Sequence, residues 1–146
     1  MWFPVLFVLT ALTLIMPIVR GSTVFWSDTF TLKGGSGDTF NCNSESESGW
    51  NAANYLVTGS ITVTGGKVDL FILNPAQWTK YTSQSGVKRG NSCASWRPTE
   101  SDVAVLGITS YSVHYLMPDN NNHTFMILNA YMYDAVVTVN LVWSPG

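Results

Sequence analysis

Hydrophobic and polar residues alternate with a period of two along most of the chain, from about residue 22 onward. Such alternation, in segments rich in β-branched and aromatic residues between Gly, Asn, Asp and Ser clusters, is typical of half-buried antiparallel strands. Strands are expected over residues 22–32, 39–43, 55–66, 67–74, 103–118, 124–132 and 136–143. The pattern therefore predicts an all-β chain, a jelly-roll-like antiparallel β-sandwich of seven or eight strands.

The third and fourth of these segments look like a hairpin. Four apolar residues share one face of the first segment: Tyr55, Val57, Ile61 and Val63. Gly65-Gly66 then provides a tight-turn signal, so we expect the two segments to pair. The second segment places Val68, Leu70 and Ile72 on one face. Asp69 points the other way, and we expect it to be a face or edge residue without a catalytic task.

The first 21 residues are set apart by their composition, because residues 2–19 are apolar and Arg20 is the first charged side chain. One interpretation is a signal peptide cleaved after Gly21. The other is an uncleaved membrane anchor, since about 18 apolar residues are just enough to cross a bilayer core as a helix. Both place residues 22–146, expected to form one domain, in the secretory lumen or outside the cell.

The longest irregular stretch covers residues 76–102, after Asn74-Pro75 ends the preceding strand. We expect no helix beyond a single turn near Ala76. Long loops in compact domains are usually functional, and this one carries aromatic and basic residues suited to a binding surface. The candidate contact residues for a partner or ligand are Trp78, Tyr81, Trp96 and Arg97. For Trp96 the alternative is packing over a nearby disulfide.

That disulfide is predicted from the only two cysteines, Cys42 and Cys93, since an even pair in an oxidising compartment favours a bridge. A zinc site is the alternative, but the paired ligand spacing and nearby histidines are missing. Asn122-His123-Thr124 is an N-glycosylation sequon in a polar turn, which makes Asn122 a candidate glycosylation site.

Charge and motifs disfavour several function classes. Removal of residues 1–21 takes away one of only seven Lys and Arg residues, against nine Asp and Glu, so no basic patch for nucleic acid is expected. The sequence contains no His-Glu-x-x-His, Gly-x-Ser-x-Gly or phosphate-loop motif, and we predict a protein that is not an enzyme. The acidic residues at 28, 38, 45 and 47 lack the rhythm of a calcium loop, so a solvated acidic loop is favoured and no metal or cofactor is expected.

Two stretches resemble GOLD-type (Golgi dynamics) domains, compact β-sandwiches that act in protein–protein recognition in the secretory pathway. "GSITVTGGKVDLFILNPAQW" is similar to their central strand pair, and "HTFMILNAYMYDAVVTVNLVW" to their closing pair. The resemblance covers roughly residues 55–143. It implies a GOLD-like fold and a recognition role, and it brings no catalytic residues. Transmembrane cargo receptors of this type carry a coiled coil, a span and a tail after the sandwich, which the sequence after Trp143 does not contain.

Two functions follow as hypotheses. The first is a non-catalytic, secreted or membrane-tethered β-sandwich that acts as a protein-recognition or structural subunit with a protein partner. The second is a carbohydrate-binding, lectin-like module that uses the aromatic residues of the 76–102 loop.

Overall fold

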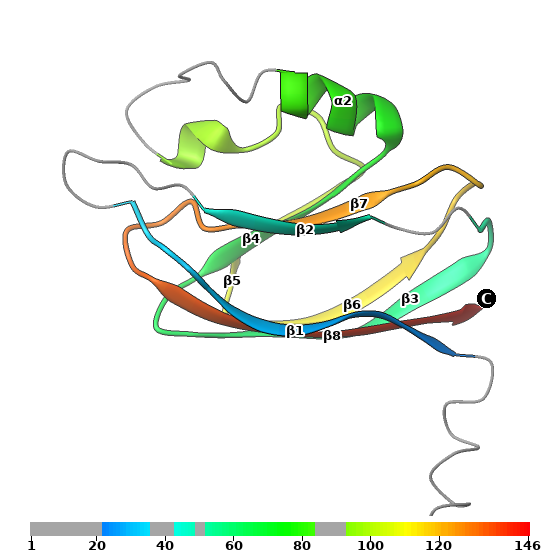
Figure 1. Cartoon of the computed structure of the whole chain (residues 1–146), viewed down its shortest axis with the longest axis horizontal. Coiled ribbons are helices and arrows are strands. Elements are labelled where there is room, and N and C mark those ends of the chain that lie inside the picture. The colour runs from blue at the N-terminus through cyan, green and yellow to red at the C-terminus, as the bar shows by residue number, and fades with distance from the viewer. Residues whose placement is uncertain (1–21, 36–42, 49–51, 84–92) are drawn as a thin grey trace, which may run out of the picture.

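The computed structural model describes residues 22–35, 43–48, 52–83 and 93–146. Within these residues, eight strands form two four-stranded antiparallel sheets that pack face to face, which confirms the predicted antiparallel β-sandwich (Figure 1). The first sheet has the order β1-β8-β3-β6, and the second has the order β2-β7-β4-β5. The strands are β1 (Thr23–Leu32), β2 (Ser44–Ser48), β3 (Tyr55–Thr64), β4 (Val68–Leu73), β5 (Val103–Ile108), β6 (Ser110–Leu116), β7 (Thr124–Leu128) and β8 (Ala135–Pro145).

Strand β8 shows how the sequence specifies this packing. The residues between its inward positions are all more exposed than the inward residues themselves. The inward residues are all buried: Ala135, Val137, Val139, Leu141 and Trp143. The strand pairs with β1 on one side and β3 on the other. A central strand with one apolar face must cover that face with the opposite sheet, and burial of such side chains supplies most of the driving force for folding.

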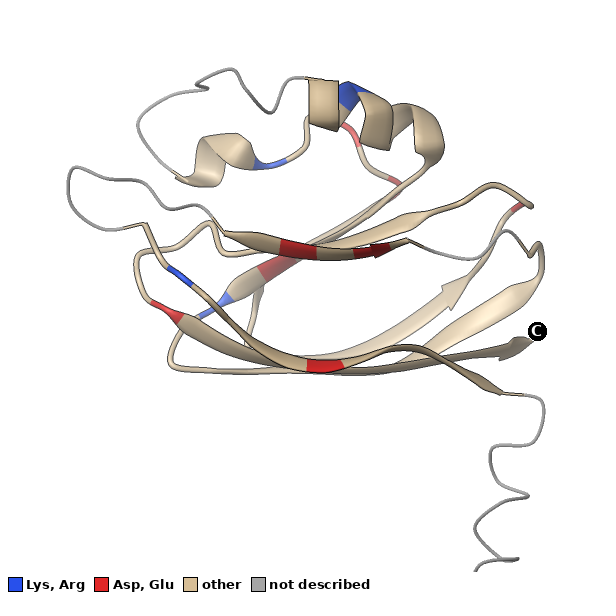
Figure 2. Ribbon diagram, viewed as in Figure 1, with Lys and Arg blue, Asp and Glu red and all other residues tan. Residues whose placement is uncertain are grey.

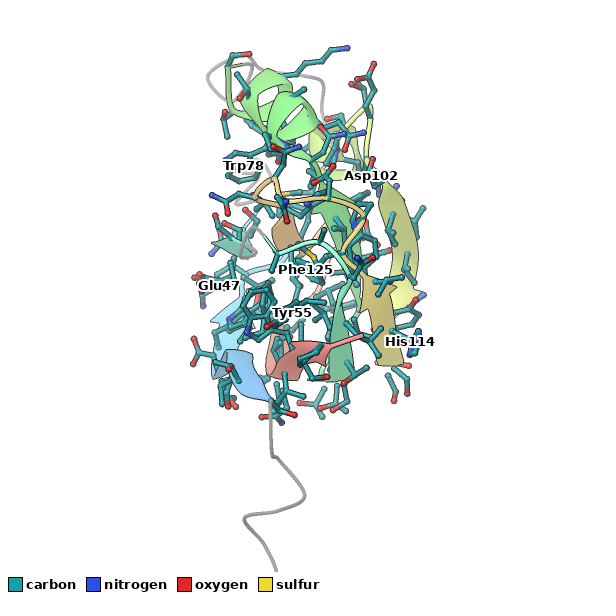
Figure 3. All side chains as sticks on the ribbon, turned by 90° about the vertical axis from the view of Figure 1, so that its right-hand side faces the viewer. Glu47, Tyr55, Trp78, Asp102, His114 and Phe125 are labelled. Atoms are coloured by element: carbon teal, nitrogen blue, oxygen red, sulfur yellow. The ribbon has the colours of Figure 1, made fainter. Side chains whose placement is uncertain are left out.

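A third layer covers the outer face of the second sheet (Figure 1). It contains helix α2 (Pro75–Ser83) and the short 3₁₀ helix η2 (Cys93–Trp96). As a result β4 and β7 are buried on both faces. Their residues divide between two apolar clusters, one inside the sandwich and one beneath the helices. In Figure 3, Phe125 lies in the interior, and Trp78 lies in the helical layer because it belongs to α2.

Helix α2 corrects the expectation of at most one helical turn near Ala76. Pro75 occupies the first helical position, where its fixed φ suits a helix and its missing N–H is not needed. The Asn74 side chain accepts a hydrogen bond from the Gln77 N–H at 2.9 Å, and the Gln77 side chain accepts one from the Asn74 N–H at 3.0 Å. This reciprocal arrangement is a capping box, so Asn74-Pro75 both ends β4 and starts the helix.

The predicted hairpin over residues 55–74 is also wrong. Strand β3 pairs with β6 and β8, whereas β4 pairs with β5 and β7, so the turn at Gly65-Gly66 carries the chain from one sheet to the other. The segment 103–118 likewise divides at Thr109 into β5 and β6, which belong to different sheets. Apolar alternation shows which face of a strand is buried, but both sheets bury the same inner face, so alternation does not reveal the partner strand.

The acidic stretch 44–48, expected to be a loop, forms the exposed strand β2 and pairs with β7. Most of the predicted strand 39–43 and all of residues 1–21 lie outside the described residues. Among the helices that the structure describes, none has the length and apolarity required to cross a bilayer.

Candidate binding site at one end of the sandwich

A pocket of about 390 Å³ lies where the β3–β4, β5–β6 and β7–β8 loops come together at one end of the sandwich, on the left in Figure 1. Of the described residues, six line it: Gly66, Lys67, Thr109, Tyr131, Met132 and Tyr133. Two of them, Met132 and Tyr133, leave 66% and 70% of their surface exposed, although both carry large apolar groups. Adjacent exposed apolar side chains beside a pocket are characteristic of a contact surface.

The loop that carries Met132 and Tyr133 is fixed by Asn129, which is fully buried. The Asn129 side-chain amide donates to the carbonyl of Leu32 at 3.0 Å and to the carbonyl of Tyr133 at 2.8 Å. Its Oδ1 accepts a hydrogen bond from the N–H of Tyr131 at 3.0 Å. The first bond ties the loop to the end of β1, and the other two hold the loop's own backbone, so the exposed side chains are presented on a constrained backbone.

Next to the pocket residue Tyr131, the carboxylate of Asp69 is fully buried but well satisfied. Its Oδ2 accepts a hydrogen bond from Arg97 Nε at 2.7 Å. Its Oδ1 accepts hydrogen bonds from the Tyr131 hydroxyl at 2.6 Å and from the Gly107 N–H at 3.0 Å. A charge is stable inside a protein only when paired and hydrogen-bonded in this way, so the network holds β4, β5, the chain after η2 and the β7–β8 loop together.

Two cations lie close to the ring of Tyr131, with Lys67 Nζ 5.8 Å and Arg97 Cζ 5.7 Å from the ring centroid. Burial raises the pKa of Tyr131, and the hydrogen bond and charge of Asp69 raise it further against the opposing effect of Arg97. For Arg97, burial acts to lower the pKa, but the hydrogen bond and charge of Asp69 outweigh it and the pKa is raised. Tyr131 therefore stays a neutral donor and Arg97 a cation at physiological pH.

The structure places the predicted contact residues in two groups. Trp78, Tyr81 and Trp96 come together beneath α2 and η2 and pack on the second apolar cluster, which contains Phe71 and Leu73. Trp78 and Tyr81 stack with their ring centroids 5.9 Å apart. The Tyr81 hydroxyl donates to the carbonyl of Trp96 at 3.0 Å. All three rings are half-buried, so much of their surface is used to attach the helical layer to the sheet.

The fourth predicted residue, Arg97, belongs instead to the Asp69 network. Asp69 itself does point away from Val68, Leu70 and Ile72, as expected. It is not exposed, however, because the β7–β8 loop and the chain after η2 cover that face of β4. Asp69 is therefore a face residue, one of the two expected positions, and the edge position is wrong because β4 pairs with β5 and β7.

The disulfide between Cys42 and Cys93 and the glycosylation of Asn122 both stay predictions. Cys93 is buried at the start of η2, but Cys42 lies outside the described residues, so the disulfide remains a prediction. Asn122 is exposed in the β6–β7 loop, and its glycosylation is likewise untested. Among the described residues, no group of three or more His, Cys, Asp and Glu side chains is arranged to hold a metal ion.

A second polar cluster surrounds His123 near the end of the sandwich opposite the pocket. The imidazole is fully buried, with Nδ1 2.9 Å from the carbonyl oxygen of Asn121. Its Nε2 lies 3.6 Å from Asp102 Oδ2, a carboxylate that also accepts hydrogen bonds from Asn74 and Gln77. His123 therefore packs beside Asp102 near the start of α2, and its Nε2 has no hydrogen-bond partner among the described residues.

Sequence reasoning missed Tyr131, Met132, Tyr133 and Gly107. The sequence contains one signal: the pattern predicts a single strand over residues 124–132, although Asn129 interrupts its apolar run. Asn is disfavoured in strands and favoured in turns, and the strand does end at Leu128.

No protein-family model and no curated protein matches the chain. Among solved structures, the chain is similar to PliG of Aeromonas hydrophila, a periplasmic lysozyme inhibitor of g-type lysozyme. The two are 12% identical over 85% of each chain, with a TM-score of 0.42. It is also similar to a carbohydrate-binding module, CBM36, in complex with calcium and xylotriose. Here the identity is 9% over 84% of this chain and 98% of the other, with a TM-score of 0.32.

Likenesses this distant carry no argument about what the chain binds. The resemblance to GOLD-type domains also stays a prediction.

Proposed function

We propose that the chain is a non-catalytic recognition module of the secretory pathway or extracellular space that binds a protein partner through the end of the sandwich. The observation that supports this most directly is the pocket of about 390 Å³ flanked by the exposed side chains of Met132 and Tyr133. Protein interfaces are enriched in Tyr and Met, which supply large contact areas. The buried Asp69 network preorganises the same surface, which reduces the ordering required on binding.

The chain's connectivity suits such a role. Strand β1 starts at Thr23, which pairs with Trp143, and ends at Leu32, which pairs with Ala135 just after the pocket loop. A ten-residue strand is about 30 Å long, so residue 22 and the pocket lie at opposite ends of the sandwich. Cleavage or membrane attachment before residue 22 would leave the pocket end free to meet a partner.

A pull-down at endogenous level tests the proposal with three proteins: the native chain, a Met132→Ser/Tyr133→Ser double variant, and a Val24→Ser control. Val24 is 61% exposed and sits near the other end of β1, so the control removes a comparable apolar group elsewhere. We expect proteins that co-purify with the native chain and the control to be lost with the double variant. Equal recovery with all three would contradict binding through this end.

Carbohydrate binding is the alternative function, and one observation favours it. The ring of Tyr133 is exposed beside the pocket, and the half-exposed Trp78 and Tyr81 rings lie on the helical layer, so either surface could stack against a sugar. A glycan array with the native chain, Trp78→Ala and Tyr133→Ala separates the two functions. Binding that is lost in one variant would support a lectin-like module, and no binding to any sugar would remove it.

A further inference from the structure

The four outer strands of the two sheets differ in how well their free edges are protected. Edge strands that are flat, uncharged and regular tend to pair with another chain, whereas charges and bulges prevent this. Strand β1 has an irregular register between Val24 and Trp26 and carries Asp28, and β2 carries Glu45 and Glu47. Strand β5 is irregular where it faces Asp69, because the Gly107 N–H turns to the Asp69 carboxylate.

Strand β6 has none of these protections. Its seven residues, SYSVHYL, contain no proline and no Asp, Glu, Lys or Arg, and it pairs with β3 in an unbroken register. In Figure 2 the β6 ribbon is tan throughout, while β2 and β1 carry red positions. Among the described strands, β6 has β3 as its one neighbour, so its other edge is open.

The backbone groups on that open edge can be assigned from the ladder. The Met117 N–H donates to the Tyr55 carbonyl, and the Val63 N–H donates to the Thr109 carbonyl. These two pairs, Tyr55 with Met117 and Val63 with Thr109, continue the β3–β6 register by one residue at each end. Hydrogen-bonded and non-hydrogen-bonded pairs alternate in an antiparallel ladder. The odd-numbered residues of β6 therefore bond to β3, and the backbone groups of Ser110, Ser112, His114 and Leu116 face outward.

The geometry points to pairing of β6 with β6 of a second copy of this chain, in antiparallel orientation about a two-fold axis at Val113. This register overlaps the whole strand and sets each outward residue opposite another: Ser112 opposite His114, and Ser110 opposite Leu116. Four such pairs, with two bonds each, make about eight inter-chain hydrogen bonds. A two-fold interface of this kind closes on itself, so it joins two sandwiches and leaves no further free β6 edge.

The side chains agree with this register. Tyr111 and Tyr115 would lie opposite each other across the axis in non-hydrogen-bonded pairs, where side chains approach closely and aromatic pairs are favourable. Both tyrosines are half-buried and line, with Val113 and Val103, a small opening of about 80 Å³ between the sheets at this edge. His114 and Leu116 are exposed on the outer face, and His114 lies at the side of the molecule in Figure 3. A second copy would cover the opening.

The test compares the native chain with Ser112→Pro and Ser112→Ala by analytical ultracentrifugation from micromolar to near-millimolar concentrations. Ser112 lies opposite Ser60 in a non-hydrogen-bonded pair, so proline removes an outward N–H and no bond to β3. We expect the native chain and Ser112→Ala to dimerise with similar Kd values. Ser112→Pro removes two bonds from each dimer and should raise the Kd at least about tenfold. Thermal unfolding of dilute samples checks that both variants fold.

Amide hydrogen exchange on the native chain provides a test that needs no variant. The amides of Ser112, His114 and Leu116 should become protected as the concentration rises, whereas those of Tyr111, Val113 and Tyr115 should be protected at all concentrations. A chain that stays monomeric, or a dimer in which the even-numbered amides exchange freely, would overturn the proposal. Association through residues 1–21 would persist in Ser112→Pro, so that result also counts against it. Neither outcome affects the pocket-end proposal.

Discussion

Asp69 Oδ2 and Arg97 Nε lie 2.7 Å apart, although Asp69 is near the start of a buried strand and Arg97 follows a short helix 28 positions later. The Asp69 side chain is fully buried, while that of Arg97 is 29% exposed. Arg97 thus brings a charge from the chain after η2 to Tyr131, one of the residues that line the pocket. The pair connects the part of the chain that covers the second sheet to the loop that we propose as the binding surface.

Replacement of Arg97 by Met should lower the free energy of unfolding by about 3 kcal/mol. It removes the main counter-charge of a fully buried carboxylate, and breaking one partner of a buried pair costs about 3–5 kcal/mol. The partial exposure of Arg97 favours the lower value. Urea denaturation measures the change. Lys33→Met is the matched control, because the Lys33–Asp134 pair is exposed at 3.5 Å and its loss should cause no measurable change.

Trp78→Ala should lower the free energy of unfolding by about 2 kcal/mol. Loss of a fully buried aromatic residue costs about 3–5 kcal/mol, and Trp78 is half-buried against Tyr81 and the second apolar cluster. Thr79→Ala, an exposed position on the same helix, should change stability little. Thermal or urea unfolding separates the two roles considered for Trp78. Unchanged stability with lost sugar binding would show that the ring acts in recognition instead of packing.

The strands and their buried faces could be predicted because a period of two is a local signal. The alternating residues of β8, and the inward set Val57, Ile61 and Val63 of β3, are buried as expected. Partner choice could not be predicted in the same way. The alternation indicates an outer face for the side of β4 that carries Asp69 and Phe71. It contains no information about the helical layer that covers this side of the strand.

Helix α2 was predictable in principle, since Asn74, Pro75 and Gln77 form a capping signature that we took only as a strand end. The pocket was not predictable from local signals. Lys67, Thr109 and Tyr131 are widely spaced in the sequence and meet through the β3–β4, β5–β6 and β7–β8 connections. Each connection carries the chain between the two sheets, so a wrong hairpin at Gly65-Gly66 also hid the site.

Gly59→Ala should prevent folding or lower the free energy of unfolding by more than about 4 kcal/mol. Gly59 lies in β3 between β6 and β8 with φ of 146°, and a Cβ there would lie 1.9 Å from the carbonyl oxygen of Asn140. That oxygen belongs to the central strand β8, which cannot shift without loss of its own pairs. Soluble yield and thermal unfolding, with Ser60→Ala as the neighbouring control, check this. A stable Gly59→Ala protein would contradict the packing of β3 on β8.

The predicted Cys42–Cys93 bridge would close a loop of about 50 residues and add about 4 kcal/mol to stability in the chain-entropy model. Cys93 is buried at the start of η2, so the bridge would also hold the helical layer in place. We expect the intact mass to show no alkylation without reductant, and reduction to lower the urea midpoint. Alkylation of both cysteines in the unreduced native protein would exclude the bridge.

Tyr115→Phe should make stability less sensitive to alkaline pH. Burial, together with the nearby charges of Asp102 and Asp119, raises the pKa of Tyr115 from 10.0 to about 12. In the unfolded chain the phenol loses its proton near pH 10, whereas the folded protein keeps it. The stabilisation is therefore complete below pH 10 and is lost as pH rises toward 12.

Because the ring is partly exposed, we expect this contribution to be about 1 kcal/mol, less than the full shift would give. Urea denaturation at several pH values between 10 and 12 measures it. The free energy of unfolding of Tyr115→Phe should fall less steeply over this range than that of the native chain, while near neutral pH the two differ little. Parallel curves would mean that the phenol of Tyr115 ionises alike in the folded and unfolded states. The carboxylates of Asp102 and Asp119 would then have no influence on it.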